Sequence, residues 1–90
     1  YKKTLKRNEI EVYPIPTYGN LKVVVGGGAS TNIEFSLVDL SSKNLTYAIS
    51  VTRTDKQTYD LKLSPSLPAG TYILAVQQDN VPNFIKVVKL

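Results

Sequence analysis

Apolar residues in this 90-residue chain recur at every second position rather than at helical spacing. Leu21, Val23 and Val25 form one such row, and Ile33 and Leu37 belong to another. Because successive side chains of a β-strand point to opposite faces, this spacing predicts strands with one buried face. No window of about 11 residues holds an apolar stripe at i, i+3, i+4 and i+7, so we expect almost no helix.

About seven alternating segments follow one another, with turn residues between them. They are residues 10–12, 21–25, 33–37, 45–51, 59–63, 72–76 and 84–90. This number and spacing of short strands predicts an all-β fold, an immunoglobulin-like antiparallel β-sandwich with a Greek-key crossover. Tyr47, Tyr59 and Tyr72 fall in phase with the apolar positions, so we expect all three on the core face.

Two prolines and a glycine separate the first two predicted strands. Pro14 and Pro16 lack N–H groups and favour extended geometry in the residue before them. We therefore expect Tyr13–Pro16 to leave the first strand as a poorly paired connector, whose prolines block strand addition at that edge. Gly19 supplies the positive φ that turns the chain into Leu21–Val25.

Other separators predict loops. Gly26–Ser30, "GGGAS", is typical of a flexible connector, because it lacks the lysine and helix of a phosphate-binding loop. Leu67–Gly70, "LPAG", fits a type I turn with Pro68 at its second position. Tyr72 follows at the start of an apolar strand, as in the tyrosine corner of Greek-key sandwiches, where the hydroxyl bonds nearby backbone.

The net charge of +4 is concentrated at the beginning of the chain. Residues 1–10 hold four basic side chains and one acidic one, so residues 1–8 are predicted to be a basic linker and residues 9–90 the domain. A basic leader is not the basic face that nucleic acid requires, so we expect no nucleic-acid partner. No apolar run is long enough to span a membrane. The chain begins at Tyr1 and has no methionine, so we expect it to be a piece of a longer protein.

Residue types that carry catalysis or bind metals are scarce. Histidine and cysteine are absent, so the usual general base and the commonest zinc ligand are missing, and disulfides, a thiolate nucleophile and a thiolate metal site are excluded. The acidic side chains are scattered, and Asp39, Asp55 and Asp79 lie in turn contexts where aspartate bonds its own backbone. We expect neither an enzyme nor a metal or cofactor site. Tryptophan is absent as well, and Tyr18 is the one tyrosine expected to be exposed, which is little for a sugar-binding platform.

Four segments, read in order, resemble a known family. They are "VYPIPTYGNLKV" (12–23), "EFSLVDLSSKNL" (34–45), "LKLSPSLPAGTYILAV" (61–76) and "FIKVVKL" (84–90). Together they resemble the C-terminal sorting domain (type A) of cargo proteins of the type IX secretion system of Bacteroidota. The positions that match its sorting motifs are Pro14, Pro16, Gly19, Asp39, Ser41, Lys43, Gly70, Tyr72, Lys86, Val87 and Val88. Ile15 replaces an asparagine of the family pattern, and Ser42 replaces a glycine, so Asn44 becomes a candidate for the positive φ of that turn.

The resemblance implies a transport signal that is neither catalytic nor membrane-inserted. Cargo of such domains crosses the inner membrane with an N-terminal signal peptide. The folded domain is recognised in the periplasm, and a shuttle protein and an outer-membrane translocon carry the cargo to the cell surface or the medium. In many members a sortase-like cysteine peptidase removes the domain and joins the cargo to anionic lipopolysaccharide, whereas some members keep it. Residues 1–8 would then hold the junction.

Two other functions, and two questions within the sorting interpretation, stay open. The chain could be a generic immunoglobulin-like or fibronectin-III-like module of a secreted protein, with a glycan-binding or adhesion role. It could instead oligomerise through an edge strand. Within the sorting interpretation, Phe84–Leu90 either forms an edge strand that a receptor pairs with, guarded by Lys86 and Lys89, or only completes the core. Pro14, Pro16 and Gly19 likewise serve either fold geometry or direct contact.

Overall fold

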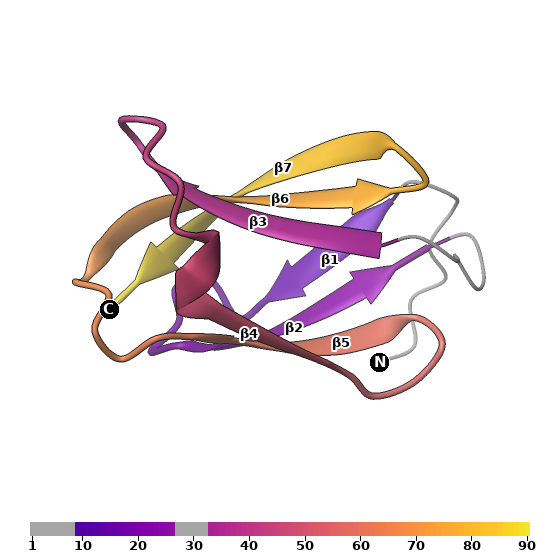
Figure 1. The fold of residues 1–90 in the computed structure, drawn as a ribbon. Helices are drawn as coiled ribbons and strands as arrows, with labels where there is room; N and C mark the ends of the chain where they lie inside the picture. The colour runs from indigo at the N-terminus through magenta and orange to yellow at the C-terminus, as the bar shows by residue number, and fades with distance from the viewer. Residues whose placement is uncertain (1–8, 27–32) are drawn as a thin grey trace.

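The computed structural model describes residues 9–26 and 33–90 and shows two antiparallel sheets (Figure 1). The strands are β1 (Ile10–Tyr13), β2 (Asn20–Val25), β3 (Ile33–Asp39), β4 (Ile49–Arg53), β5 (Thr58–Leu63), β6 (Gly70–Gln78) and β7 (Val81–Lys89). One sheet has the order β1-β2-β5-β4 and the other the order β3-β6-β7. Residues 1–8, the predicted linker, and most of the predicted Gly26–Ser30 connector lie outside the described residues.

The strand order confirms the predicted fold class. Sheets of 1-2-5-4 and 3-6-7 reproduce the arrangement of the immunoglobulin constant domain, in which the chain crosses between sheets after its second, third and fifth strands. These crossovers make the Greek-key connection that the sequence predicts. No α-helix occurs among the described residues, and none of their helices is long and apolar enough to cross a membrane.

The core lies between the sheets and is built from the alternating rows. Leu21, Val23 and Val25 of β2 are buried, and β6 buries every second residue from Tyr72 to Gln78. The other buried apolar side chains are Val24, Leu37, Leu45, Ala48, Tyr59, Leu61, Leu63, Leu67 and Val87. The predicted placement of Tyr59 and Tyr72 on the core face is therefore confirmed. The Tyr59 ring packs edge-on against the Phe35 ring, with 5.2 Å between the ring centroids.

The predicted strand over residues 45–51 is wrong in its first half. Thr46–Ala48 form a 3₁₀ helix, η1, and β4 begins only at Ile49. Leu45 and Ala48 are both buried, and a three-residue helical turn brings residues three apart onto one side. Tyr47 between them therefore points outward and is 79% exposed, which corrects its predicted place on the core face.

The edge of β3 is covered by the chain that follows it. The Leu45 amide donates to the Leu37 carbonyl at 2.7 Å, and the Leu37 amide donates to Thr46 Oγ1 at 3.1 Å. Asn44 adds an isolated bridge to Val38. The segment that contains η1 thus protects this edge from pairing with another chain.

Candidate functional site

All four sequence segments with sorting motifs meet at one end of the sandwich. Asp39 at the end of β3 pairs with Tyr72 near the start of β6, and Gly70 pairs with Lys89 at the end of β7. Thr17, in the connector between β1 and β2, forms an isolated parallel bridge with the same Lys89. This is the left end in Figure 1, where β3 and β7 finish beside the C-terminus. We call it the motif end.

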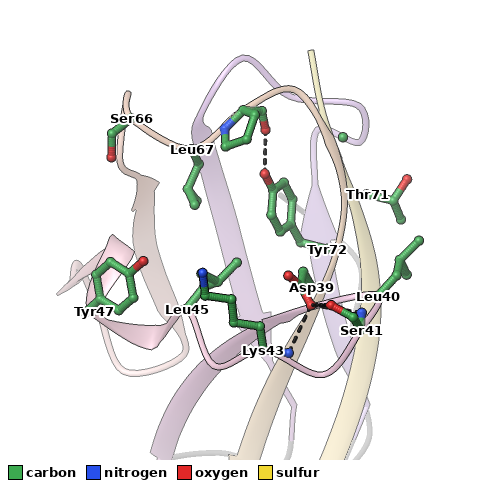
Figure 2. A pocket seen from close by; sticks show the side chains of 12 residues that line it. Asp39, Leu40, Ser41, Lys43, Leu45, Tyr47, Ser66, Leu67, Thr71 and Tyr72 are labelled. Carbon is green, nitrogen blue, oxygen red and sulfur yellow. Dashed lines mark hydrogen bonds between the residues drawn. The ribbon is translucent and has the colours of Figure 1, made fainter.

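A tight turn organised by Asp39 follows β3. Its Oδ1 atom accepts hydrogen bonds from the Ser41 amide at 2.9 Å, the Ser41 hydroxyl at 2.8 Å and the Lys43 amide at 2.9 Å (Figure 2). These bonds favour the ionised form, so they lower the pKa of Asp39, with the Lys43 amide as the largest cause. The predicted turn role of Asp39 is confirmed, because its carboxylate serves the backbone of its own loop.

Ser42 provides the positive φ of this turn. Its φ is 67°, so the residue that replaces the family's glycine adopts the left-handed conformation itself. The expectation that Asn44 would do so is wrong. Asn44 instead accepts the Thr46 amide on its side-chain oxygen at 2.9 Å, which supports the start of η1. A serine in this region costs more than glycine, and the three bonds to Asp39 hold it there.

Tyr72 forms the predicted tyrosine corner. Its ring is buried, and its hydroxyl donates to the Pro68 carbonyl at 2.5 Å (Figure 2). The hydrogen-bonded turn before it closes from the Leu67 amide to the Ser64 carbonyl at 3.0 Å, which is earlier than the predicted turn over 67–70. Gly70 opens β6 with a φ of 158°. This hydrogen bond ties the connection between the two sheets to the start of β6.

An open cleft of about 650 Å³ lies between these two turns (Figure 2). Asp39 and Tyr72 line it on the β-sheet side, and Tyr47 lies across from them. Asp39 Oδ1 is bonded to its own loop and the Tyr72 hydroxyl to Pro68, so both groups hold the turns that border the cleft. Among the described residues, no group of three or more His, Cys, Asp or Glu side chains could hold a metal ion.

The connector with the two prolines joins β1 to β2 within one sheet and touches the other sheet at Thr17, which bridges to Lys89. Tyr13 still pairs with Lys22 at the end of β1, so the predicted departure from the strand begins after it, at Pro14. The Tyr13–Pro14 and Ile15–Pro16 peptide bonds are both cis. Gly19 has a φ of 141°, which confirms its predicted positive φ, and its carbonyl accepts the Leu63 amide at 2.7 Å.

Thr17 is the residue of this site that the sequence reasoning missed. Its backbone amide donates to the Val88 carbonyl at 2.9 Å, and its carbonyl accepts the Leu90 amide at 2.8 Å. Its hydroxyl donates to the Asn20 carbonyl at 2.7 Å and accepts the Gly19 amide at 3.0 Å. Thr17 is 2% exposed. A hydroxyl residue two positions before a turn glycine was the available signal.

The three matching residues of the last segment divide into core and surface. Val87 is fully buried and pairs with Tyr72, so it completes the core. Lys86 is exposed and Val88 half-buried, and both lie on the outer face of the β3-β6-β7 sheet. In the same way Pro14 and Pro16 are exposed, whereas Tyr72 is buried.

The lowered pKa of Asp39 predicts a pH-dependent contribution to stability. A carboxylate with a lower pKa in the folded state stabilises the fold above its unfolded pKa of about 4, and this contribution is lost as the pH falls through the folded value. We expect Asp39→Asn to lower the urea midpoint near neutral pH, and the difference from the unaltered domain to shrink towards about pH 2. Asp55→Asn is the matched variant, because a hydrogen bond from the Gln57 amide likewise lowers the pKa of Asp55. A difference that stays constant with pH would contradict this role.

Comparison with known proteins gives one family. The model described as "Secretion system C-terminal sorting domain" matches residues 11–89. A search of curated proteins found no similar sequence. The matched range contains every strand of both sheets, except the first residue of β1.

Proposed function

The chain belongs to the family of secretion-system C-terminal sorting domains, and from this premise we propose that it directs its cargo through the type IX secretion system. The family is a non-catalytic signal for the secretion of the protein that carries it. On the route that we propose, the cargo passes through the periplasm, is handed to a shuttle protein, crosses the outer-membrane translocon and arrives at the cell surface or in the medium.

The observation that carries the proposal is the convergence of the four motif segments at one end of the sandwich. β1 runs from Ile10 towards this end and reaches it at Tyr13. A cargo joined before Ile10 therefore enters at the opposite end of β1. This arrangement leaves the motif end free to contact a carrier whatever the cargo is.

Side chains at the motif end are held by the domain itself. Asp39 fixes its loop, Tyr72 fixes the corner before β6, and Thr17 joins the proline connector to β7. A surface that is organised before binding loses less conformational freedom on binding. We further propose that residues 1–8 form the junction, which a sortase-like cysteine peptidase cuts in transferring the cargo to anionic lipopolysaccharide.

A reporter fusion tests this function. Residues 1–90 would be joined to an inert periplasmic protein and expressed in a bacterium with a type IX system and in its translocon-deficient mutant. We expect the reporter at the cell surface or in the medium only in the intact strain, as measured by surface labelling and fractionation. The control carries an unrelated immunoglobulin-like sandwich. A reporter that stays in the periplasm of the intact strain, with a folded domain attached, would refute the proposal.

Glycan binding is the second candidate, because one observation favours it. Tyr18 is 85% exposed, as expected, and Tyr47 is 79% exposed; both line an open cleft of about 420 Å³ that Lys62 and Ser64 also line. Exposed aromatic rings beside polar groups are the elements of a sugar site. Titration with simple sugars, followed by tyrosine NMR signals, would support this function if Tyr18→Ala and Tyr47→Ala both removed the binding.

A further inference from the structure

The outer faces of the two sheets differ in chemistry. On the β1-β2-β5-β4 sheet, Lys22 bonds Asp60 at 2.6 Å, and Lys62 lies beside them on the same face. On the β3-β6-β7 sheet the outward positions include the polar residues Glu34, Ser36, Thr71, Gln77 and Lys86, and cross-strand pairs such as Val38–Ile73 and Ala75–Phe84 bring the apolar residues of this face side by side. These residues are Val38, Ile73, Ala75, Pro82, Phe84 and Val88. Phe84 is 71% exposed, which is high for a phenylalanine in a nine-residue strand.

Hydrogen bonds at the end of β7 show which of its backbone groups point away from β6. The Val88 carbonyl and the Leu90 amide both bond Thr17, which lies on the outer side of the strand. Amide and carbonyl of one residue point the same way in a strand, and the direction alternates along it. The pairing of β7 with β6 runs without interruption from Val81 to Lys89, so the amides and carbonyls of Phe84 and Lys86 also point outward.

The outward groups of Phe84 and Lys86 have no backbone partner in the described parts of the chain. The stretch of the β7 edge that holds these outward groups is called the window. It is bounded at one end by Thr17, which pairs with the end of β7, and at the other by Pro82, which has no N–H group. The window therefore spans residues 83–87. Lys86 is the one cation on this outer face, and within residues 9–26 and 33–90 no ion pair to it is found.

The other edges are less suited to pairing. The β3 edge is covered by residues 44–46. β1 has four residues and is followed by Pro14, and the five residues of β4 present Ser50 and Thr52 on their outward face. β7 combines the longest edge with an apolar outer face and lies at the motif end.

The geometry points to β7 as a strand-addition site: an extended strand of the secretion machinery pairs with residues 83–87 and places an acidic side chain beside Lys86, between apolar ones. The acidic side chain pairs with Lys86, which has no ion pair within the part of the chain that the structure describes, and the apolar residues extend the face formed by Phe84 and Val88. The inference rests on the proposed function and names how its carrier binds. A window of five residues buries less area than a stable complex needs, which suits a contact that is made and then released.

Proline substitution tests the backbone pairing. Lys86→Pro and Phe84→Pro each remove an outward amide that the fold itself does not use, which edge strands tolerate. In the reporter fusion we expect export to fall at least about ten-fold for both variants, with a smaller loss for Lys86→Ala. Folding is checked on the purified domains by circular dichroism and urea unfolding. A folded proline variant that exports its reporter normally would overturn the inference; if one variant does not fold, the other decides.

Charge reversal tests the chemistry of the partner strand. Lys86→Glu is expected to reduce export more than Lys86→Ala, whereas Lys62→Glu, the same change on the outer face of the other sheet, leaves export unchanged. Equal effects of the two reversals would overturn the acidic partner. Light scattering of the isolated domain should give a monomer; a dimer that Lys86→Pro abolishes would assign the edge to a second copy instead. If the unaltered fusion is not exported, the proposed function fails first, which separates the two results.

Discussion

Deletion of residues 87–90 is expected to unfold the domain, and not merely to remove a recognition signal. Val87 is fully buried between the sheets, and the segment provides the carbonyl and amide that bond Thr17. Losing one buried valine costs about 2 kcal/mol and each lost backbone bond about 1 kcal/mol. The sum, roughly 5 kcal/mol with the lost pairs to β6, equals the whole stability of many small domains. Circular dichroism and urea unfolding of the trimmed chain would measure it.

Deletion of Leu90 alone is the matched control. Leu90 is 50% exposed and contributes one backbone bond, so its removal should cost only about 1 kcal/mol. A trimmed chain lacking residues 87–90 that keeps the urea midpoint of the intact domain would show that the end of β7 is not part of the fold. The consequence for export studies is direct. Loss of export after the larger deletion does not by itself distinguish recognition from folding, whereas the single changes at Phe84 and Lys86 do.

Thr17→Val is expected to destabilise the domain by about 2–4 kcal/mol. Valine keeps the shape of threonine but leaves the Asn20 carbonyl and the Gly19 amide without the hydroxyl that now bonds both. Polar groups left unpaired where water reaches them only partly, as at these two bonds, cost more than the same bonds contribute when made. For a domain of this size the loss corresponds to a fall in Tm of roughly 10–25 °C. Differential scanning calorimetry would measure it.

Thr17→Ser separates the hydroxyl from the methyl group. Serine keeps both hydrogen bonds and loses one methyl group, so we expect a cost of about 1 kcal/mol or less. If the serine variant were less stable than the valine variant, packing rather than hydrogen bonding would hold the connector. The backbone bonds of Thr17 to Val88 and Leu90 survive in both variants, so the comparison isolates the side chain.

Much of the site could be predicted because its signals are local. Gly19 adopts the expected positive φ, Tyr72 bonds backbone four residues before it, and Asp39 bonds the loop that follows it. Each of these interactions joins residues that are close in sequence, so residue type and spacing carry the information. The roles of Gly19, Asp39 and Tyr72 in their turns could therefore be predicted from the sequence.

Predictions failed where two conformations share the same pattern. Thr46, Tyr47 and Ala48 alternate like a strand, yet a single helical turn buries Leu45 and Ala48 on one side and exposes Tyr47. Alternation over three residues cannot separate these cases. The turn after β3 failed for a related reason. Both Ser42 and Asn44 can adopt positive φ, and only the bonds to Asp39 decide which one does.

The sequence by itself determined an all-β chain, the positions of most strands and the side chains that face inward, because the period of a strand is a property of consecutive residues. Only the tertiary structure decided which segments become neighbours. It joined Thr17 to the end of β7, covered the β3 edge with residues 44–46 and left Phe84 and Lys86 on an open edge. A two-residue period indicates which face of the sheet a side chain occupies, whereas hydrogen bonds between segments distant in the sequence determine what lies beside it.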